Sequence, residues 1–123
     1  MIARSLFLFT FCVAAGCDAP APNITVTEAL VAPTTRAAAI YATIRNRGGP
    51  DRLTGIEIDG RVPISLHETT SDDGVMRMRG VDMLAVPANG RLDLKSGGPH
   101  GMAIGQLTVD GSSVPLTFRF ERH

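Results

Sequence analysis

The sequence predicts an all-β fold of the sandwich or barrel type, and three observations support this prediction. No segment longer than about ten residues shows the 3.6-residue periodicity of an amphipathic helix. Turn signals recur about every eight to twelve residues, which is typical of sandwiches and barrels. Thirteen Gly and eight Pro among 123 residues are too many for a helical bundle. A chain of this length is expected to form a single domain.

The first candidate strands lie in the N-terminal half. Residues 24–27 alternate apolar and polar side chains and predict a strand, and residues 32–35 predict a loop. Residues 40–44 alternate clearly, as in a half-buried strand. Residues 53–59 predict a third strand, closed by the dipeptide Asp59-Gly60, which suits a tight hairpin turn.

A fourth strand is expected where Val62, Ile64 and Leu66 mark its core-facing side. Alternation then turns His67 away from the core, at the end of this strand and near the edge of the sandwich. Residues 68–74 are polar and end in glycine, so the sequence predicts a loop there.

The second half of the chain continues the same pattern. Residues 75–79 predict a short strand in which Met76 and Met78 share one face. Residues 87–90, with a proline and an Asn-Gly dipeptide, predict a turn. Further strands are expected around Leu92 and Leu94, over residues 104–109 and over residues 114–120, the last two joined at Asp110-Gly111.

The N-terminus predicts an export signal over residues 1–16. Arg4 supplies a positive charge, a short apolar run follows, and small residues precede Cys17. This arrangement resembles a bacterial lipobox, so Cys17 is expected to be the lipidated first residue of the mature chain. Residues 17–22 are expected to be a flexible leader, and residues 23–123 the folded domain. Soluble export, by cleavage near residues 19–21, remains the alternative.

Both cysteines belong to this N-terminal region. Cys12 lies in the signal and Cys17 at its edge, so the mature domain has no thiol for a disulfide, a nucleophile or a metal ligand. The composition is otherwise that of an ordinary globular protein. Twelve basic residues balance twelve acidic ones, and no basic patch is evident, so nucleic acid is not an expected partner.

Two histidines and two methionines between residues 67 and 102 suggest a metal site. Ten residues separate His67 from Met78, and twenty-one separate Met78 from His100, which is followed by Gly101 and Met102. In extended backbone His100 and Met102 point to the same side, about 7 Å apart at Cα. Imidazole together with thioether suits Cu(I) and few other biological ions.

The other candidate residues have plainer interpretations. Met76 and Met83 are interpreted as core-filling side chains, because a methionine in an apolar run is more often packing than ligand. His123 is expected to be a surface residue, and residues 72–73 solvated turn residues. We find no nucleophile with a base, no pair of carboxylates in a plausible pocket and no phosphate-binding loop, so an enzyme is not expected.

The spacing of His67, Met78, His100 and Met102 resembles that of the PCuAC family of periplasmic copper chaperones, which carry copper toward the CuA centre of cytochrome c oxidase. The resemblance extends to residues 39–44, 51–53, 66–68, 74–79, 86–90 and 97–100. It implies a cupredoxin-like Greek-key β-sandwich that binds one Cu(I), with Cu(II) bound more weakly, through those four side chains.

Some features depart from the family pattern. Leu30 stands where an aromatic residue is common, and Gly101 replaces a bulkier residue between the last two ligands. The family's optional Met- and His-rich tail is missing, which argues against a second copper site. Blue-copper electron transfer is not expected, because such a site needs a cysteine ligand.

The resemblance therefore implies a monomeric copper chaperone in the periplasm, held to the membrane only by a lipid anchor at Cys17. Its expected partner is a copper acceptor, either the CuA-bearing oxidase subunit or another assembly chaperone. Binding should weaken in acid, because both histidines must be neutral to bind copper. Two alternatives remain open: a periplasmic copper buffer or resistance protein, and a metal-free β-sandwich interaction module.

Overall fold

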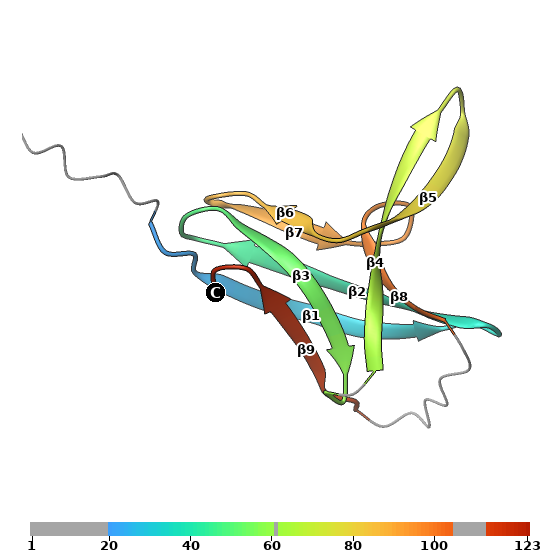
Figure 1. Ribbon diagram of the computed structural model, residues 1–123, viewed down its shortest axis with the longest axis horizontal. Coiled ribbons are helices and arrows are strands. Elements are labelled where there is room, and N and C mark those ends of the chain that lie inside the picture. Colours follow the sequence, from blue (N-terminus) through green and yellow to red (C-terminus); the bar gives the residue numbers. More distant parts are fainter. Residues whose placement is uncertain (1–19, 61, 105–112) are drawn as a thin grey trace, which may run out of the picture.

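The computed structural model describes residues 20–60, 62–104 and 113–123, and within these ranges the regular elements are all β-strands (Figure 1). No helix in this part of the chain is long and apolar enough to cross a membrane. The predicted signal segment, residues 105–109 of the predicted strand 104–109 and the Asp110-Gly111 turn lie outside the described residues. The strands are β1 (Ile24–Pro33), β2 (Ala37–Asn46), β3 (Asp51–Ile58), β4 (Val62–Asp72), β5 (Val75–Val81), β6 (Leu84–Val86), β7 (Gly90–Leu94), β8 (His100–Ile104) and β9 (Leu116–Phe120).

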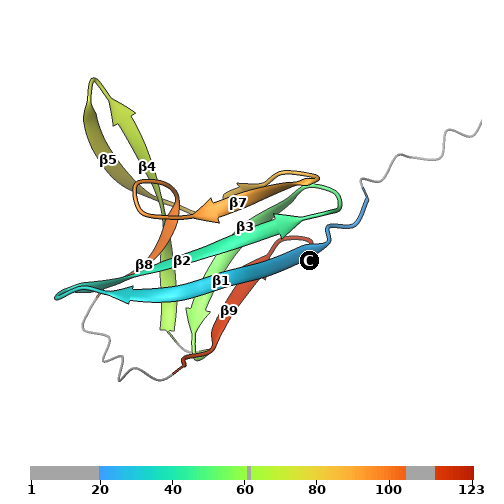
Figure 2. The same ribbon diagram turned by 180° about the vertical axis from the view of Figure 1, so that it is seen from behind.

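Two layers of antiparallel strands pack against each other (Figures 1 and 2). In the first layer β2 pairs with β1 on one side and with both β7 and β8 on the other. In the second layer β3 pairs with β6 and β9. Strand β4 joins the layers, because its beginning pairs with β3 and its later part with β8 and β5. The predicted all-β sandwich is confirmed.

The core lies between the layers and is almost entirely aliphatic. Ile40, Ile44, Leu53, Ile56 and Val86 are the largest fully buried apolar side chains. They alternate with more exposed residues along β2 and β3, so each strand contributes one face. Burying a side chain of this size contributes about 1.5–3 kcal/mol, and these contacts hold the strands in register.

The first strands mostly match the sequence prediction. Strand β3 ends where expected, and Asp59 and Gly60 follow it with φ values of 53° and 64°, the left-handed turn that Asp-Gly favours. The predicted loop at residues 32–35 is wrong in part, because β1 continues to Pro33. Proline is tolerated there because β1 lies at the edge of the sheet.

The largest correction concerns residues 68–74, which were predicted to form a loop. Strand β4 instead runs on to Asp72, and the turn consists only of Asp73 and Gly74, with φ values of 49° and 79°. Both are positive, as a two-residue type I′ hairpin turn requires. The segment is polar because this part of the hairpin projects beyond the core, so polarity does not exclude a strand here (Figure 1). For the same reason His67 lies in mid-strand and not at a strand end.

The hairpin of β4 and β5 is the most solvent-exposed part of the fold. Every residue from 71 to 80 is exposed, and the segment pairs only within the hairpin. Met76 is 60% exposed and Met83 41%, so their interpretation as core-filling side chains is wrong. Val62, expected on the core-facing side of β4, is 41% exposed, whereas Ile64 is buried as predicted.

Strands β7 and β8 lie end to end along β2, interrupted by a short loop. The loop is closed by hydrogen bonds from the Lys95 amide to the Pro99 carbonyl, 2.9 Å, and from the Gly98 amide to the Lys95 carbonyl, 3.1 Å. Strand β8 starts at His100, earlier than the expected start at residue 104. Both His100 and Met102 therefore lie in regular strand.

The last strand, β9, adds to the free edge of β3. Arg119 donates to Glu57 across this pair, with Nε 2.9 Å from Oε1. This hydrogen bond, together with the guanidinium charge, holds the pKa of Glu57 below its usual range. The chain ends with His123 exposed, as expected, its ring 6.0 Å from that of Phe120.

Candidate metal centre

The two predicted histidine ligands face each other across neighbouring strands. His67 in β4 lies directly opposite His100 in β8, and two residues along, Ser65 lies opposite Met102. Opposite residues in an antiparallel pair point to the same face of the sheet, and so do residues two apart in one strand. His67, His100 and Met102 therefore share one face.

The fourth candidate ligand comes from the hairpin. Met78 in β5 lies opposite Thr69 in β4, and Gly80 lies opposite His67. Met78 thus projects from the same face as His67, on the diagonal from it, where Cα atoms are about 7–8 Å apart. The intervening residues Leu66 and Gly101 are buried toward the core, so the four candidate ligands lie on the outer face of the sheet.

The two imidazole rings are close and nearly parallel. Their centroids are 5.8 Å apart with an interplanar angle of 21°. A metal bound through one ring nitrogen at about 2.0 Å lies roughly 3 Å from that ring's centroid. Because the rings are stacked, a shared ion would require the His67 ring to turn until one of its nitrogens points at the ion bound by His100. His100 is only 4% exposed, although it lies on the outer face.

Hydrogen bonds fix the His100 ring. Its Nδ1 lies 2.8 Å from the Gly98 carbonyl oxygen. Because a carbonyl oxygen can only accept, Nδ1 carries the proton and Nε2 presents its lone pair. Thr69 Oγ1 donates to the same carbonyl at 3.2 Å, so β4 helps to hold the loop that orients the ring. Metal-binding histidines typically have such a partner on their second nitrogen.

The ring of His67, in contrast to that of His100, has a buried nitrogen, Nδ1, without a hydrogen-bond partner among the described residues. An unsatisfied buried polar atom of this kind costs about 1–3 kcal/mol, and natural folds avoid it unless the atom has another use. Binding to a metal would satisfy a ring nitrogen of this residue.

The two methionines differ in their surroundings. Met102 is half-buried, and its neighbour across the strand pair on β2 is Ala39, whose small side chain leaves room beside it. Met78 is 55% exposed. In the pairing register the two methionines lie on opposite sides of the histidine pair along the strands. Met78 has farther to reach to an ion at His100, because β4 lies between its strand and β8.

Gly101 lies between two candidate ligands, but it faces the core. Its missing side chain would point into the core, not toward a bound ligand. A Cβ there would lie 2.9 Å from Ile64 Cγ2, 3.1 Å from Ile40 Cβ and 3.2 Å from Ile56 Cδ1. Glycine therefore lets β8 pack tightly on the core while the residues on either side of it point outward.

Other donors do not form a competing site in the part of the chain that the structure describes. No group of three or more His, Cys, Asp or Glu side chains is placed to hold a metal ion there.

The described part of the chain is thus a two-layered β domain with two paired histidines and two methionines on one outer face. The chain belongs to the LpqE-like family, whose model, "Putative lipoprotein LpqE-like", matches residues 22–123. No curated protein sequence is significantly similar to the chain.

A solved structure has the same fold. The copper-bound PCuAC domain from PmoF2 matches with a TM-score of 0.63 and 21% sequence identity, over 83% of this chain and 85% of that domain. At this identity the similarity concerns the fold, and it confirms the predicted cupredoxin-like β-sandwich.

Proposed function

We propose that the mature protein is an exported copper chaperone that binds one Cu(I) through His67, Met78, His100 and Met102. The observation that carries the proposal is the strand register. It pairs the two histidines directly and turns both methionines to the same face. The copper-bound state of the PmoF2 domain, which has the same fold, adds support.

The donor set suits binding followed by release. Imidazole and thioether match the preference of Cu(I) for soft ligands. Thioethers are neutral and bind less strongly than thiolates, so an acceptor rich in thiolates can withdraw the ion. Both cysteines of the chain, Cys12 and Cys17, precede the folded domain, so no thiolate of the domain competes for the ion.

Met78 is the ligand that completes the site. Its strand belongs to the exposed hairpin and pairs with β4 but not with β8, so its backbone lies farther from His100 than that of Met102 does. Copper therefore draws the hairpin toward the His67–His100 pair, and loss of Met78 from the ion starts its release. The hairpin is suited to this movement because its outer part has few contacts with the core.

The cellular setting follows from the N-terminal sequence. Residues 1–16 direct export, Cys17 receives a lipid, residues 17–22 form the leader, and the periplasm is the site of action. The lipoprotein description of the LpqE-like family supports this assignment. The acceptor is the CuA-bearing oxidase subunit or another assembly chaperone, and the role is that of a carrier, not of an enzyme.

Anaerobic Cu(I) titration combined with X-ray absorption tests this proposal. One copper per chain with two nitrogen and two sulfur donors is expected, and Met78→Leu and His100→Ala should each lower the affinity more than tenfold. Met83→Leu is the matched control, because Met83 contacts Arg52 on β3 and not the histidines. If both ligand variants bind copper as tightly as the control, the proposed site is wrong.

Delivery and buffering differ in their consequence for the cell. If the protein delivers copper, deletion of its gene lowers oxidase activity when copper is scarce. If it only buffers copper, deletion increases copper sensitivity and leaves the oxidase unchanged.

A further inference from the structure

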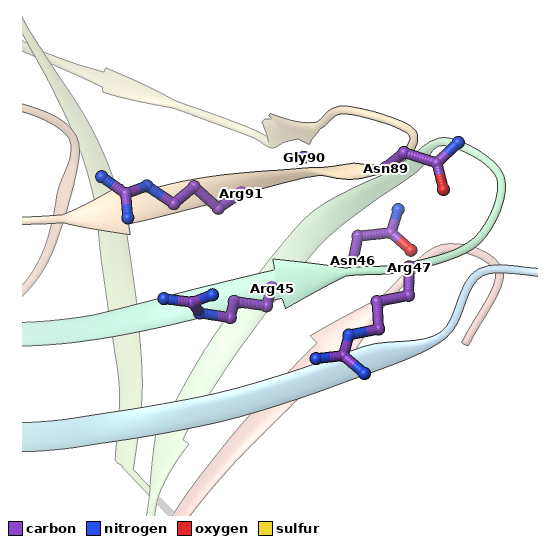
Figure 3. Close-up of a pocket in the computed structure, with 6 residues that line it drawn as sticks. All are labelled: Arg45, Asn46, Arg47, Asn89, Gly90 and Arg91. Atoms are coloured by element: carbon purple, nitrogen blue, oxygen red, sulfur yellow. The ribbon is translucent and has the colours of Figure 1, made fainter.

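A cluster of arginines lies at the C-terminal end of β2, whereas the histidine pair lies beside the middle of that strand. Arg45, Arg47 and Arg91 line a cleft of about 320 Å³ (Figure 3), beside Asn46, Asn89 and Gly90. The sequence prediction that the chain has no basic patch is therefore wrong. The cluster escapes notice in the sequence because β2 and β7 bring together residues that are far apart along the chain.

The charge of this cluster is only partly balanced. Arg91 forms an ion pair with Asp93, 3.1 Å between Nε and Oδ2, whereas no ion pair of Arg45 or Arg47 is found among the described residues. Arg45 and Arg91 are direct cross-strand partners, and like charges in that position destabilise a sheet. An anionic group in the cleft would remove this repulsion.

The cluster lies where the N-terminal leader joins the domain. The Arg47 amide donates to the Asn23 carbonyl at 3.0 Å, and the Gly49 amide to the Ala21 carbonyl at 3.2 Å. The Asn23 amide in turn donates to Asn46 Oδ1 at 3.1 Å. The leader is thereby fixed to the same end of β2 from which the arginines project.

Covalent geometry limits the distance from this end to the lipid. Pro20 is three residues after Cys17, and three Cα–Cα steps span at most about 11 Å. The Debye length at physiological ionic strength is about 8 Å, which is comparable with this reach, so charges at this end of the domain can act on a membrane surface when the leader brings them against it.

We propose that Arg45, Arg47 and Arg91 dock on anionic phospholipid headgroups and set the orientation of the domain on the membrane. This inference rests on the lipid anchor in the proposed function. The histidine pair lies beside the middle of β2, because the β2–β8 register places His100 next to Tyr41, about 13 Å along the strand from Arg45 for four steps of 3.3 Å each. The β4–β5 hairpin projects from a part of the domain far from the start of the leader at Pro20 (Figure 1), so docking of the arginine end on lipid leaves the hairpin open to an acceptor protein.

Vesicle binding by the mature chain tests the inference. The chain is prepared lipidated and, separately, with Cys17→Ser, so that in the second form only the protein surface can bind. Cosedimentation at low salt compares phosphatidylcholine vesicles with vesicles containing one third phosphatidylglycerol. The Cys17→Ser chain should bind only the anionic vesicles, and Arg45→Gln and Arg47→Gln should each weaken this binding about fivefold.

The matched control is the double variant Arg36→Gln/Arg77→Gln. It removes as much charge as the double variant Arg45→Gln/Arg47→Gln, but from exposed positions outside the cleft. Equal binding by the two double variants, or binding that ignores phosphatidylglycerol, would overturn the inference. So would stabilisation of the protein by inorganic phosphate through the same arginines without any vesicle binding, which would indicate a site for a small anion.

The lipid anchor itself is checked by mass spectrometry of the mature protein. If Cys17 is unmodified while the Cys17→Ser chain still selects anionic vesicles, the arginine surface stands and only the anchor is wrong. If Cys17 is lipidated but the arginine variants bind as wild type does, the anchor stands and the surface is wrong.

Discussion

Substitution of Gly101 tests how tightly the proposed ligand strand is packed on the core. In Gly101→Ala the added methyl group would lie 2.9 Å from Ile64 Cγ2, 3.1 Å from Ile40 Cβ and 3.2 Å from Ile56 Cδ1. Ile56 presents the end of its side chain and can adjust, whereas Ile64 Cγ2 is bonded directly to Cβ and is held by the stiff χ1 of a β-branched residue. The Ile40 contact involves Cβ, which is fixed to the backbone of β2, so β8 must move.

The expected cost follows from core overpacking, which is typically about 1–3 kcal/mol. Alanine also restricts the unfolded chain, which offsets about 0.4–1 kcal/mol of this cost. The net destabilisation is therefore between about 0 and 2.6 kcal/mol. For a domain of this size it corresponds to a fall in Tm of up to about 20 °C.

Thermal unfolding followed by circular dichroism measures this effect. Gly55→Ala is the control, because a Cβ at Gly55 meets nothing within 4 Å, and its Tm should stay the same or rise slightly. Because Gly101 lies between His100 and Met102, a shift of β8 should also weaken Cu(I) binding, whereas Gly55→Ala should not. A Gly101→Ala protein as stable as the Gly55→Ala protein would refute the account of how β8 is packed.

Three further predictions concern the proposed copper site. Thr69→Val removes the hydroxyl that donates to the Gly98 carbonyl, so Cu(I) affinity should fall about tenfold by competition with a chromophoric chelator, with one copper still bound. Met76→Leu should weaken binding less than Met78→Leu, because Met76 lies one step farther along the same face of β5; equal losses in titration would make Met76 a ligand as well. Amide hydrogen exchange of residues 71–80 should slow when Cu(I) binds, and unchanged exchange would refute closure of the hairpin.

A fourth prediction in the same group concerns pH. Affinity measured by titration between pH 8 and 5 should fall on acidification, because protons compete for both imidazoles while the thioethers do not titrate. A pH-independent affinity would show that the histidines do not bind the metal.

Alternation predicted the strands that have one face in the core and one in water. Strand β2 and the end of β3 were located from this signal, because their buried residues recur every second position. The signal fails for the outer half of β4, where both faces meet solvent and no apolar residue recurs. The Asp73-Gly74 dipeptide, which is as strong a hairpin signal as Asp59-Gly60, could have identified this hairpin.

The spacing of the four candidate ligands selected residues that share one face, but it could not supply their arrangement. Register depends on which strands pair, and β8 reaches β4 only through contacts between residues distant in the sequence. The pairing of His67 with His100 therefore depends on the tertiary structure and cannot be read from the spacing. The arginine cluster also depends on the tertiary structure, because it combines one end of β2 with the start of β7.

The four proposed ligands differ in how firmly the fold holds them, and this difference bears on copper release. Strand β8 is held on the core through Gly101, and Gly98 fixes the ring of His100, so the His100 and Met102 end of the site is rigid. His67 lies where β4 begins to extend beyond the core, and Met78 lies farther out on the exposed hairpin. An ion bound to all four can lose Met78 without disturbing the core, which opens one coordination position to an acceptor ligand while the histidines still hold the copper. Gradual exchange of ligands of this kind requires one ligand on a weakly held element, and the β4–β5 hairpin provides it.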